Sequence, residues 1–209
     1  MFTGFTAFDL VVLVISLFVS LACHEAMHAY VAHALGDDTA HQEGRITLNP
    51  FKHVDIFTSV LLPFVLILLH LPPFFAAKPV PFNPSRIRFE EFGVALVGLA
   101  GPLTNLVLAI AAALFIRLSG GATGTEVYQA LSVFIQVNLG FFVFNMIPFP
   151  PLDGSRLLYA FAPDPLRKLM ETVESMGFLT IIIFMLIFFP FFSPAIANIT
   201  TSIYTFLLR

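Results

Sequence analysis

The sequence predicts an all-α membrane protein whose chain crosses the bilayer several times. Of its 209 residues, 58% are apolar by a count that omits glycine, and only 11% are charged. Soluble domains have about 45–50% apolar residues with glycine included and about 25% charged residues, so this composition excludes an ordinary soluble domain. The length, together with the lack of an internal repeat or a low-complexity linker, predicts a single integral-membrane domain over residues 1–209.

The expected transmembrane helices follow from the apolar runs, because a helix needs about 20 residues to cross the hydrocarbon core. Three runs meet this length, at residues 10–35, 92–118 and 127–147. A further apolar stretch is interrupted by Pro190 and Pro194. It predicts either two short crossings, at residues 178–192 and 195–208, or one crossing followed by a surface helix. We therefore expect about five transmembrane helices.

Two shorter features are not typical of transmembrane helices. Residues 56–75 are apolar but contain Pro63, Pro72 and Pro73, so we expect a re-entrant segment there. Residues 45–49, with the sequence RITLN, alternate between polar and apolar side chains and predict a short β-hairpin-like element. Its edge could pair with an extended peptide, although an ordinary surface hairpin explains the alternation equally well.

Two histidines and a glutamate interrupt the first apolar run, in the sequence HEAMH. Residues four apart on an α-helix are separated by about 40° around the axis, so His24 and His28 project toward one point. This spacing suits two ligands of Zn²⁺, with Glu25 placed to take a proton from water. Two buried histidines that only form hydrogen bonds are the alternative. That alternative is weaker here, because an ionisable side chain at membrane depth costs about 2.5 kcal/mol or more.

A catalytic zinc site also needs a third protein ligand and an open fourth position. Six carboxylates are candidates: Asp37, Asp38, Glu43, Asp55, Glu90 and Asp153. Three prolines break the helix that ends near Asn145, and Gly154 loosens the backbone beside Asp153. Irregular backbone at membrane depth is tolerated only where it lines a cavity. A metal best explains a carboxylate there, so we expect Asp153 as the third ligand and one Zn²⁺ per chain.

These residues also carry a resemblance to a known family. HEAMH followed by N-x-x-P-x-x-x-x-D-G at residues 145–154 resembles the site-2 protease family of intramembrane zinc metalloproteases. The sequence GLAGPLTN at residues 98–105 is similar to an intervening helix motif of that family. GRITLNPFKHVD and AKPVPFNP resemble its small bacterial and archaeal branch, which lacks extra domains.

The resemblance covers nearly the whole chain and implies roles for individual residues. It implies that His24, His28 and Asp153 are the zinc ligands and that Glu25 is the general base. It also implies a role near the substrate or the metal for Asn145. The implied reaction is hydrolysis of peptide bonds in or near transmembrane segments, so the expected partners are transmembrane protein substrates and the lipid bilayer.

A shared ion would also fix the topology. The end of the first helix and the break near Asn145 must then lie at one depth, so the chain between them crosses the bilayer an even number of times. The runs at residues 92–118 and 127–147 provide two crossings, which leaves residues 56–75 re-entrant. Most basic residues then fall on one side: Arg45, Lys52, Lys78, Arg86, Arg88, Arg156, Arg167 and Lys168. The positive-inside rule makes that side cytoplasmic. We expect a multi-pass protein of a prokaryotic cell membrane with its active site toward the cytoplasm.

Two asparagines and one histidine–aspartate pair have more than one interpretation. Asn105 and Asn145 carry neutral donors that could stabilise the oxyanion of the tetrahedral intermediate. Asn105 could equally join helices within the bilayer, since polar side chains often do so. His53 and Asp55 could support or gate the metal, but an interfacial pair satisfied by nearby backbone is the simpler interpretation.

The remaining histidines and the glycine motif are interpreted as structural. His33, His41 and His70 belong to this group, because His33 lies five residues after His28 and points away from the paired face. Gly98 and Gly101 are expected to let a neighbouring helix approach closely.

Two other functions fit parts of the pattern. A catalytically silent membrane scaffold would share the fold, although the two histidines, the glutamate and Asp153 are all present. A transporter or cofactor-binding protein could use the histidines as a proton or haem site, but it would not need Glu25 beside His24. The net charge of −3 and the lack of a basic run give no reason to expect nucleic-acid binding, and nothing in the sequence predicts an oligomer.

Overall fold

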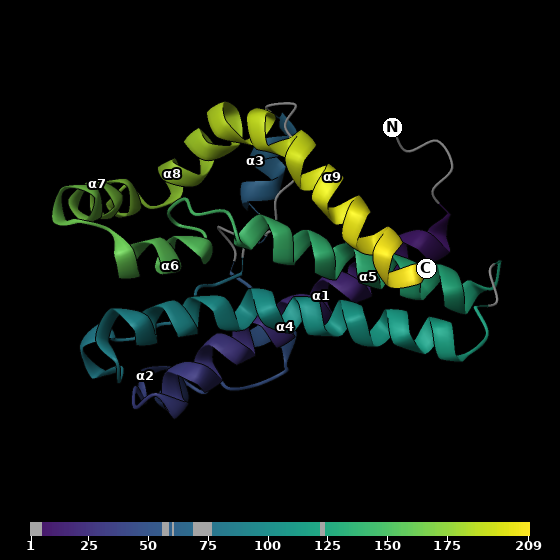
Figure 1. Cartoon of the computed structure of the whole chain (residues 1–209), viewed down its shortest axis with the longest axis horizontal. Helices are drawn as coiled ribbons and strands as arrows, with labels where there is room; N and C mark the ends of the chain where they lie inside the picture. Colours follow the sequence, from purple (N-terminus) through teal and green to yellow (C-terminus); the bar gives the residue numbers. More distant parts are fainter. Residues whose placement is uncertain (1–5, 56–58, 60, 69–76, 122–123) are drawn as a thin grey trace.

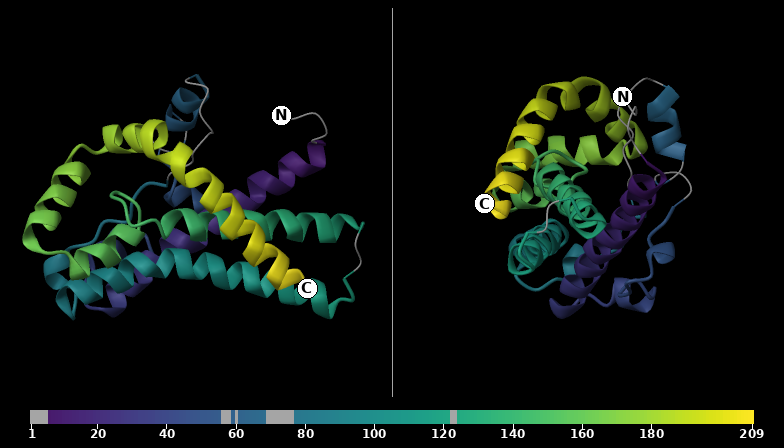
Figure 2. Two further views of the ribbon diagram at one scale, coloured as in Figure 1. Left: turned by 45° about the horizontal axis from the view of Figure 1, so that its top comes forward. Right: turned by 90° about the vertical axis from the view of Figure 1, so that its right-hand side faces the viewer.

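Long helices make up the framework of the molecule (Figure 1). The computed structural model describes residues 6–55, 59, 61–68, 77–121 and 124–209. Helix α4 (Glu90–Leu118) packs against both α1 (Ala7–Ala34) and α5 (Glu126–Asn145). Helix α9 (Phe189–Leu208) crosses α5 and α4 obliquely, as the two views of Figure 2 show. The described part of the chain is thus helical, as the sequence predicts.

Helix α1 places its polar side chains inside and its apolar side chains outside. Its buried polar residues are Ser16, Ser20, His24, Glu25 and His28, whereas Leu10 and Ile15 are more than half exposed. Thr6 begins the helix with a capping box, in which its hydroxyl accepts from the Asp9 N–H and the Asp9 carboxylate accepts from the Thr6 N–H. An apolar outer surface is what lipid contact requires, and the polar inner face is available for chemistry.

Small residues allow α4 and α5 to pack closely. Ala109, Ala112 and Ala113 of α4 form a buried cluster with Ile135 and Leu139 of α5. Small side chains are enriched at helix interfaces in membranes, where close van der Waals packing holds helices together.

Four stretches of the described chain are long and apolar enough to cross a membrane: α1, α4, α5 and Leu179–Leu208. The fifth transmembrane helix is not confirmed. In the last stretch, α8 (Phe178–Ile183), a π-helical turn η4 (Phe184–Phe188) and α9 follow one another without a loop, and the number of crossings they make stays a prediction. Pro190 lies in the first turn of α9, directly after the wider π-turn, and Pro194 lies inside α9.

The expected re-entrant segment at residues 56–75 lies largely outside the described residues. Within it, α3 (Leu62–Leu68) is described. Seven helical residues extend about 10 Å, which is too short to cross a bilayer.

The β-hairpin prediction for residues 45–49 is wrong, because the structure has no strand among the residues it describes. Arg45 is buried and donates hydrogen bonds to the carbonyls of Lys52, Lys78 (2.5 Å) and Pro79 (3.2 Å). Asn49 accepts from the Phe51 N–H and begins the short helix η1 (Pro50–Lys52). The alternation in the sequence therefore reflects an arginine turned inward to bind backbone, not a pleated edge.

After α1 the chain reverses direction at Gly36, and hydrogen bonds fix the loop that follows. Gly36 has φ +107°, and the N–H groups of Gly36 and Asp37 donate to the carbonyls of His33 and Ala32. Asp37 is fully buried and accepts from Thr39 and from the Asn83 N–H at 2.6 Å. Burial alone would raise the pKa of Asp37, but these hydrogen bonds hold it below its ordinary value. Short helices α2 (Thr39–Gln42) and η3 (Pro84–Arg86) adjoin this loop.

The segment between α5 and α8 contains a helical hairpin beside α4. It contains α6 (Gly154–Phe161), which packs on α4, and α7 (Asp164–Ser175). Figure 1 shows both at the end of the molecule where α4 begins. The irregular segment between α5 and α6 carries Asp153 toward α1.

Candidate metal centre

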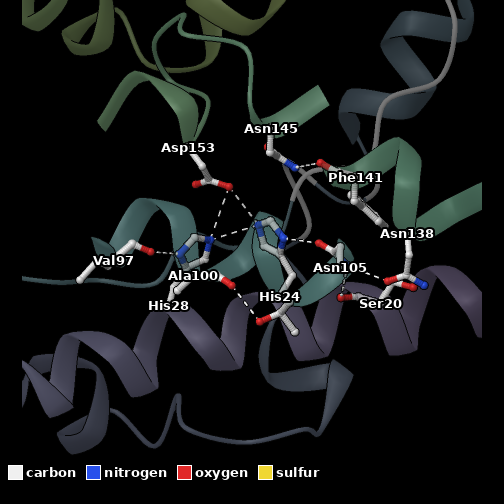
Figure 3. Close-up of polar contacts among 11 residues, drawn as sticks. Ser20, His24, His28, Val97, Ala100, Asn105, Asn138, Phe141, Asn145 and Asp153 are labelled. Carbon is white, nitrogen blue, oxygen red and sulfur yellow. Dashed lines mark hydrogen bonds and ion pairs between the residues drawn. The ribbon is translucent and has the colours of Figure 1, made fainter. Parts of the chain in front are cut away.

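The structure brings His24, His28 and Asp153 together at one point, although Asp153 lies 129 residues after His24 (Figure 3). The Nε2 atoms of the two histidines are 3.1 Å apart. They lie 3.0 and 3.5 Å from one Asp153 carboxylate oxygen, Oδ2. Ligands at about 2.05 Å from a tetrahedral Zn²⁺ are separated by about 3.3 Å, so the three atoms have the spacing of a zinc site.

Hydrogen bonds on the far side of each ring determine which nitrogens face the centre. The Nδ1 of His24 contacts Asn105 Oδ1 at 2.6 Å, and the Nδ1 of His28 contacts the Val97 carbonyl at 2.7 Å. Both partners are acceptors, so each neutral imidazole donates through Nδ1 and presents a lone pair at Nε2. Two lone pairs and a carboxylate oxygen within about 3 Å repel one another unless a cation lies between them. The donor set and its surroundings therefore fit Zn²⁺.

Asn105 is held by a buried network and orients His24. Its amide nitrogen donates to the Ser20 carbonyl at 3.2 Å and to Asn138 Oδ1 at 2.9 Å. Asn138 in turn donates to the Phe134 carbonyl. Both N–H groups of Asn105 are thus used, which leaves no donor for an oxyanion and makes it a positioning residue. Sequence reasoning missed Asn138, whose signal is an amide in the middle of a predicted transmembrane helix.

Gly101 and Gly98 make room for the site as well as for helix packing. A Cβ on Gly101 would lie 2.6 Å from the Nε2 of His24 and closer still to that of His28. A Cβ on Gly98 would lie 2.6 Å from the Cβ of Arg156 and 3.0 Å from the Asp153 carbonyl. The expectation that these glycines allow close approach fits the structure, but the groups that approach are the side chains and backbone of the site.

The three residues line a cavity of about 450 Å³. Glu25 also lines it and is only 8% exposed. The walls are mostly apolar and come from α1, α5, α8 and the irregular segment around Val80. A buried carboxylate next to three potential metal ligands in one cavity is the arrangement of a hydrolytic metal centre.

Known proteins similar to this chain in sequence carry provisional names as zinc metalloproteases. The chain is 40% identical to YwhC of Bacillus subtilis over 178 residues, which cover 82% of this chain and 78% of that protein. It is 32% identical to MJ0611 of Methanocaldococcus jannaschii over 154 residues, which cover 72% of each. The chain belongs to the site-2 protease family. Rip2 of Mycolicibacterium smegmatis is 26% identical over 175 residues, 64% of its length. No family model and no solved structure matches the chain.

Asn145 lies at the edge of the cavity in this member of the site-2 protease family. Its side-chain amide donates to the Phe141 carbonyl at 3.1 Å and points toward that carbonyl in Figure 3, while the residue lines the same cavity as Asp153. Its place is compatible with a donor to substrate, a role that stays a prediction.

His53 and Asp55 are not among the described residues that line the cavity. His53 is fully buried; its Nε2 contacts the Thr47 carbonyl at 2.9 Å and its own carbonyl accepts from the Lys78 N–H at 2.7 Å. The Asp55 N–H donates to the Ser59 hydroxyl. The contacts of His53 connect the loop to the segment that forms the cavity wall. The roles of His53 and Asp55 stay predictions.

A second polar group at the cavity was missed by the sequence reasoning. Arg156 of α6 forms a two-pronged ion pair with Glu174 of α7, and the Tyr159 hydroxyl donates to the same carboxylate at 3.1 Å. Arg156 and Glu174 both line the cavity. Burial and the adjacent Glu174 raise the pKa of Tyr159 to about 12. The group fixes α6, and therefore Asp153 at its beginning, against α7.

Proposed function

We propose that this chain is a zinc endopeptidase that hydrolyses peptide bonds in or near transmembrane segments of other membrane proteins. The observation that supports it is the convergence of His24, His28 and Asp153 beside Glu25 in one cavity. The provisional names of the relatives support zinc metalloprotease activity.

The location of the cavity supports a substrate within the membrane. Ala34, the last residue of α1, lies ten residues after His24, which is about 15 Å along the helix axis. The hydrocarbon core is about 30 Å thick, so His24 would lie well inside it. The end of α1 adjoins the segment before α4 that contains Arg86 and Arg88, and Arg45 lies in the loop after α1, which supports the cytoplasmic side as the nearer one.

The residues of the chain divide the reaction among them. His24, His28 and Asp153 would hold Zn²⁺, which when bound supplies Lewis-acid polarisation and lowers the pKa of water. Glu25 takes a proton from the attacking water and delivers it to the amide nitrogen as the C–N bond breaks. Asn145 is the donor that we assign to the developing oxyanion. Asn105 and the Val97 carbonyl keep the two imidazoles oriented throughout.

Glu25→Gln is the test, because it keeps the proposed ligands and removes only the base. The purified variant should retain one zinc per chain and cleave membrane-spanning peptides about 10²- to 10⁴-fold more slowly than wild type. Glu126→Gln, an exposed acid at the start of α5, is the matched control and should cleave normally. Asp153→Ala should lose both zinc and cleavage.

Three results would contradict the proposal. Wild-type turnover by Glu25→Gln would remove Glu25 as the base. Cleavage of an unfolded soluble protein but of no membrane-spanning peptide would contradict the substrate class. Zinc-loaded wild-type protein with no cleavage in the whole panel would favour a silent scaffold.

A further inference from the structure

A second group of metal-binding side chains lies at the end of α1, outside the cavity. His33 in the last turn of α1, Asp38 before α2 and His41 within α2 each place one ligand atom within 4.8 Å of the others. The Nδ1 of His33 is 2.6 Å from Asp38 Oδ1, and the two imidazole rings have centroids 4.7 Å apart. Their spacing in the sequence does not by itself predict a site, and the sequence interpretation of His33 and His41 is a structural one.

Hydrogen bonds to buried residues fix the backbone of the turn that carries these three side chains. Gly36 reverses the chain at φ +107°, and the buried Asp37 binds both Thr39 and Asn83. The Arg45 N–H closes the far side of α2 by donating to the Ala40 carbonyl at 2.9 Å. The three side chains thus project from a fixed turn, so little backbone order would have to be created on binding a ligand.

We propose that His33, Asp38 and His41 form a second binding site for a divalent transition metal, with Zn²⁺ as the ion that tests it. Two imidazoles and one carboxylate are a donor set that suits zinc, and water completes the coordination at an exposed site. Carbonyls at the end of α1 add partial negative charge. The ligand atoms lie within 4.8 Å of one another and must adjust to separations of about 3.3 Å. The hydrogen-bonded His33–Asp38 pair would move slightly apart and His41 would move closer, which rotation of these exposed side chains allows.

The second site should bind zinc more weakly than the inner one, because its side chains are more exposed to solvent. The side chains of His33 and Asp38 are 41% and 55% exposed, whereas those of His24 and His28 are 5% and 9% exposed. The surface ion should therefore exchange readily and be removed by a mild chelator that leaves the inner ion in place. Because Asp37 and Arg45 belong to the same turn, a bound ion would also stiffen the loop that holds the cavity wall.

The experiment counts zinc on tag-free Glu25→Gln protein. After brief treatment with a mild chelator it should retain one zinc per chain, and titration with Zn²⁺ alone should bring this to two. The same protein carrying His33→Asn and His41→Asn should stop at one, and zinc should no longer raise its melting temperature. Glu43→Gln, an exposed carboxylate in the same loop outside the group, is the control and should still bind two.

Either of two results would overturn the second site. In the first, Glu25→Gln protein with the native loop binds no second zinc at about 100 μM free ion. In the second, the protein that also carries His33→Asn and His41→Asn still binds two. A protein that takes up the exchangeable ion but retains none after chelation contradicts the inner centre instead. Failure of this inference and failure of the proposed function are therefore distinguishable.

Discussion

Gly101 offers a sharper test of the metal centre than removal of a ligand, because the substitution adds one methyl group and deletes nothing. In Gly101→Ala the new Cβ would lie 2.6 Å from the Nε2 of His24, about 0.8 Å short of the 3.4 Å at which ordinary contacts begin. The Nε2 of His28 would be closer still. Zinc sites keep their ligand distances within about 0.2 Å, so a shift of this size removes the imidazoles from coordinating positions.

The expected result is a loss of at least 100-fold in zinc affinity, because changes to residues that only orient ligands already cost 10- to 100-fold. Gly140→Ala is the matched control. Gly140 lies within α5, and a Cβ there would meet nothing within 4 Å. Since alanine favours a helix over glycine by about 1 kcal/mol, this control should be neutral or slightly stabilised.

Zinc affinity is measured by competition with a chromogenic chelator, and cleavage is measured on the same preparations. Gly101→Ala should be inactive and zinc-poor while its circular dichroism and elution volume match those of Gly140→Ala. If Gly101→Ala binds zinc as tightly as Gly140→Ala does, the two imidazoles do not hold an ion where the structure places them.

Two further predictions concern residues that support the site. Asn105→Leu should weaken zinc binding about 10- to 100-fold, because His24 loses the acceptor that orients its ring; the chelator competition measures this loss, and unchanged affinity would contradict the positioning role of Asn105. Since the pKa of Asp37 is below its ordinary value in the folded protein, its contribution to stability is present above about pH 4 and is lost as the pH falls further. Melting temperatures between about pH 3 and 6 should show this loss in wild type and less of it in Asp37→Asn; equal pH dependence would contradict the assignment.

The sequence was enough to predict the three candidate metal ligands but not the contacts that orient them. The i, i+4 relation of His24 and His28 depends only on helix geometry, and Asp153 could be chosen because proline-broken backbone at membrane depth needs a cavity. The contacts that orient the rings depend on how α1, α4 and α5 are rotated against one another. That rotation is set by packing of small residues over many turns, so Asn138 and the Val97 carbonyl could not be assigned from the sequence.

The error in the fold has a similar origin. The RITLN alternation predicted a pleated edge because a strand pattern treats Arg45 as an outward side chain. In the structure, carbonyls distant in sequence accept hydrogen bonds from its guanidinium. The error arises because the local sequence does not specify which partner a side chain will meet.

The centre also links metal binding to the stability of the fold. Its ligands come from α1 and from the segment before α6, while α4 supplies the Val97 carbonyl, Asn105 and the space at Gly101. Without a cation, three electron-rich atoms face one another within 3.5 Å in a buried place, which opposes the packing of these elements. With a cation, the same atoms draw them together. Because the unfolded chain lacks the site, the free energy of metal binding adds to the free energy of folding. A variant that loosens α4 against α1 should therefore bind zinc more weakly and melt at a lower temperature, and added zinc should raise that melting temperature.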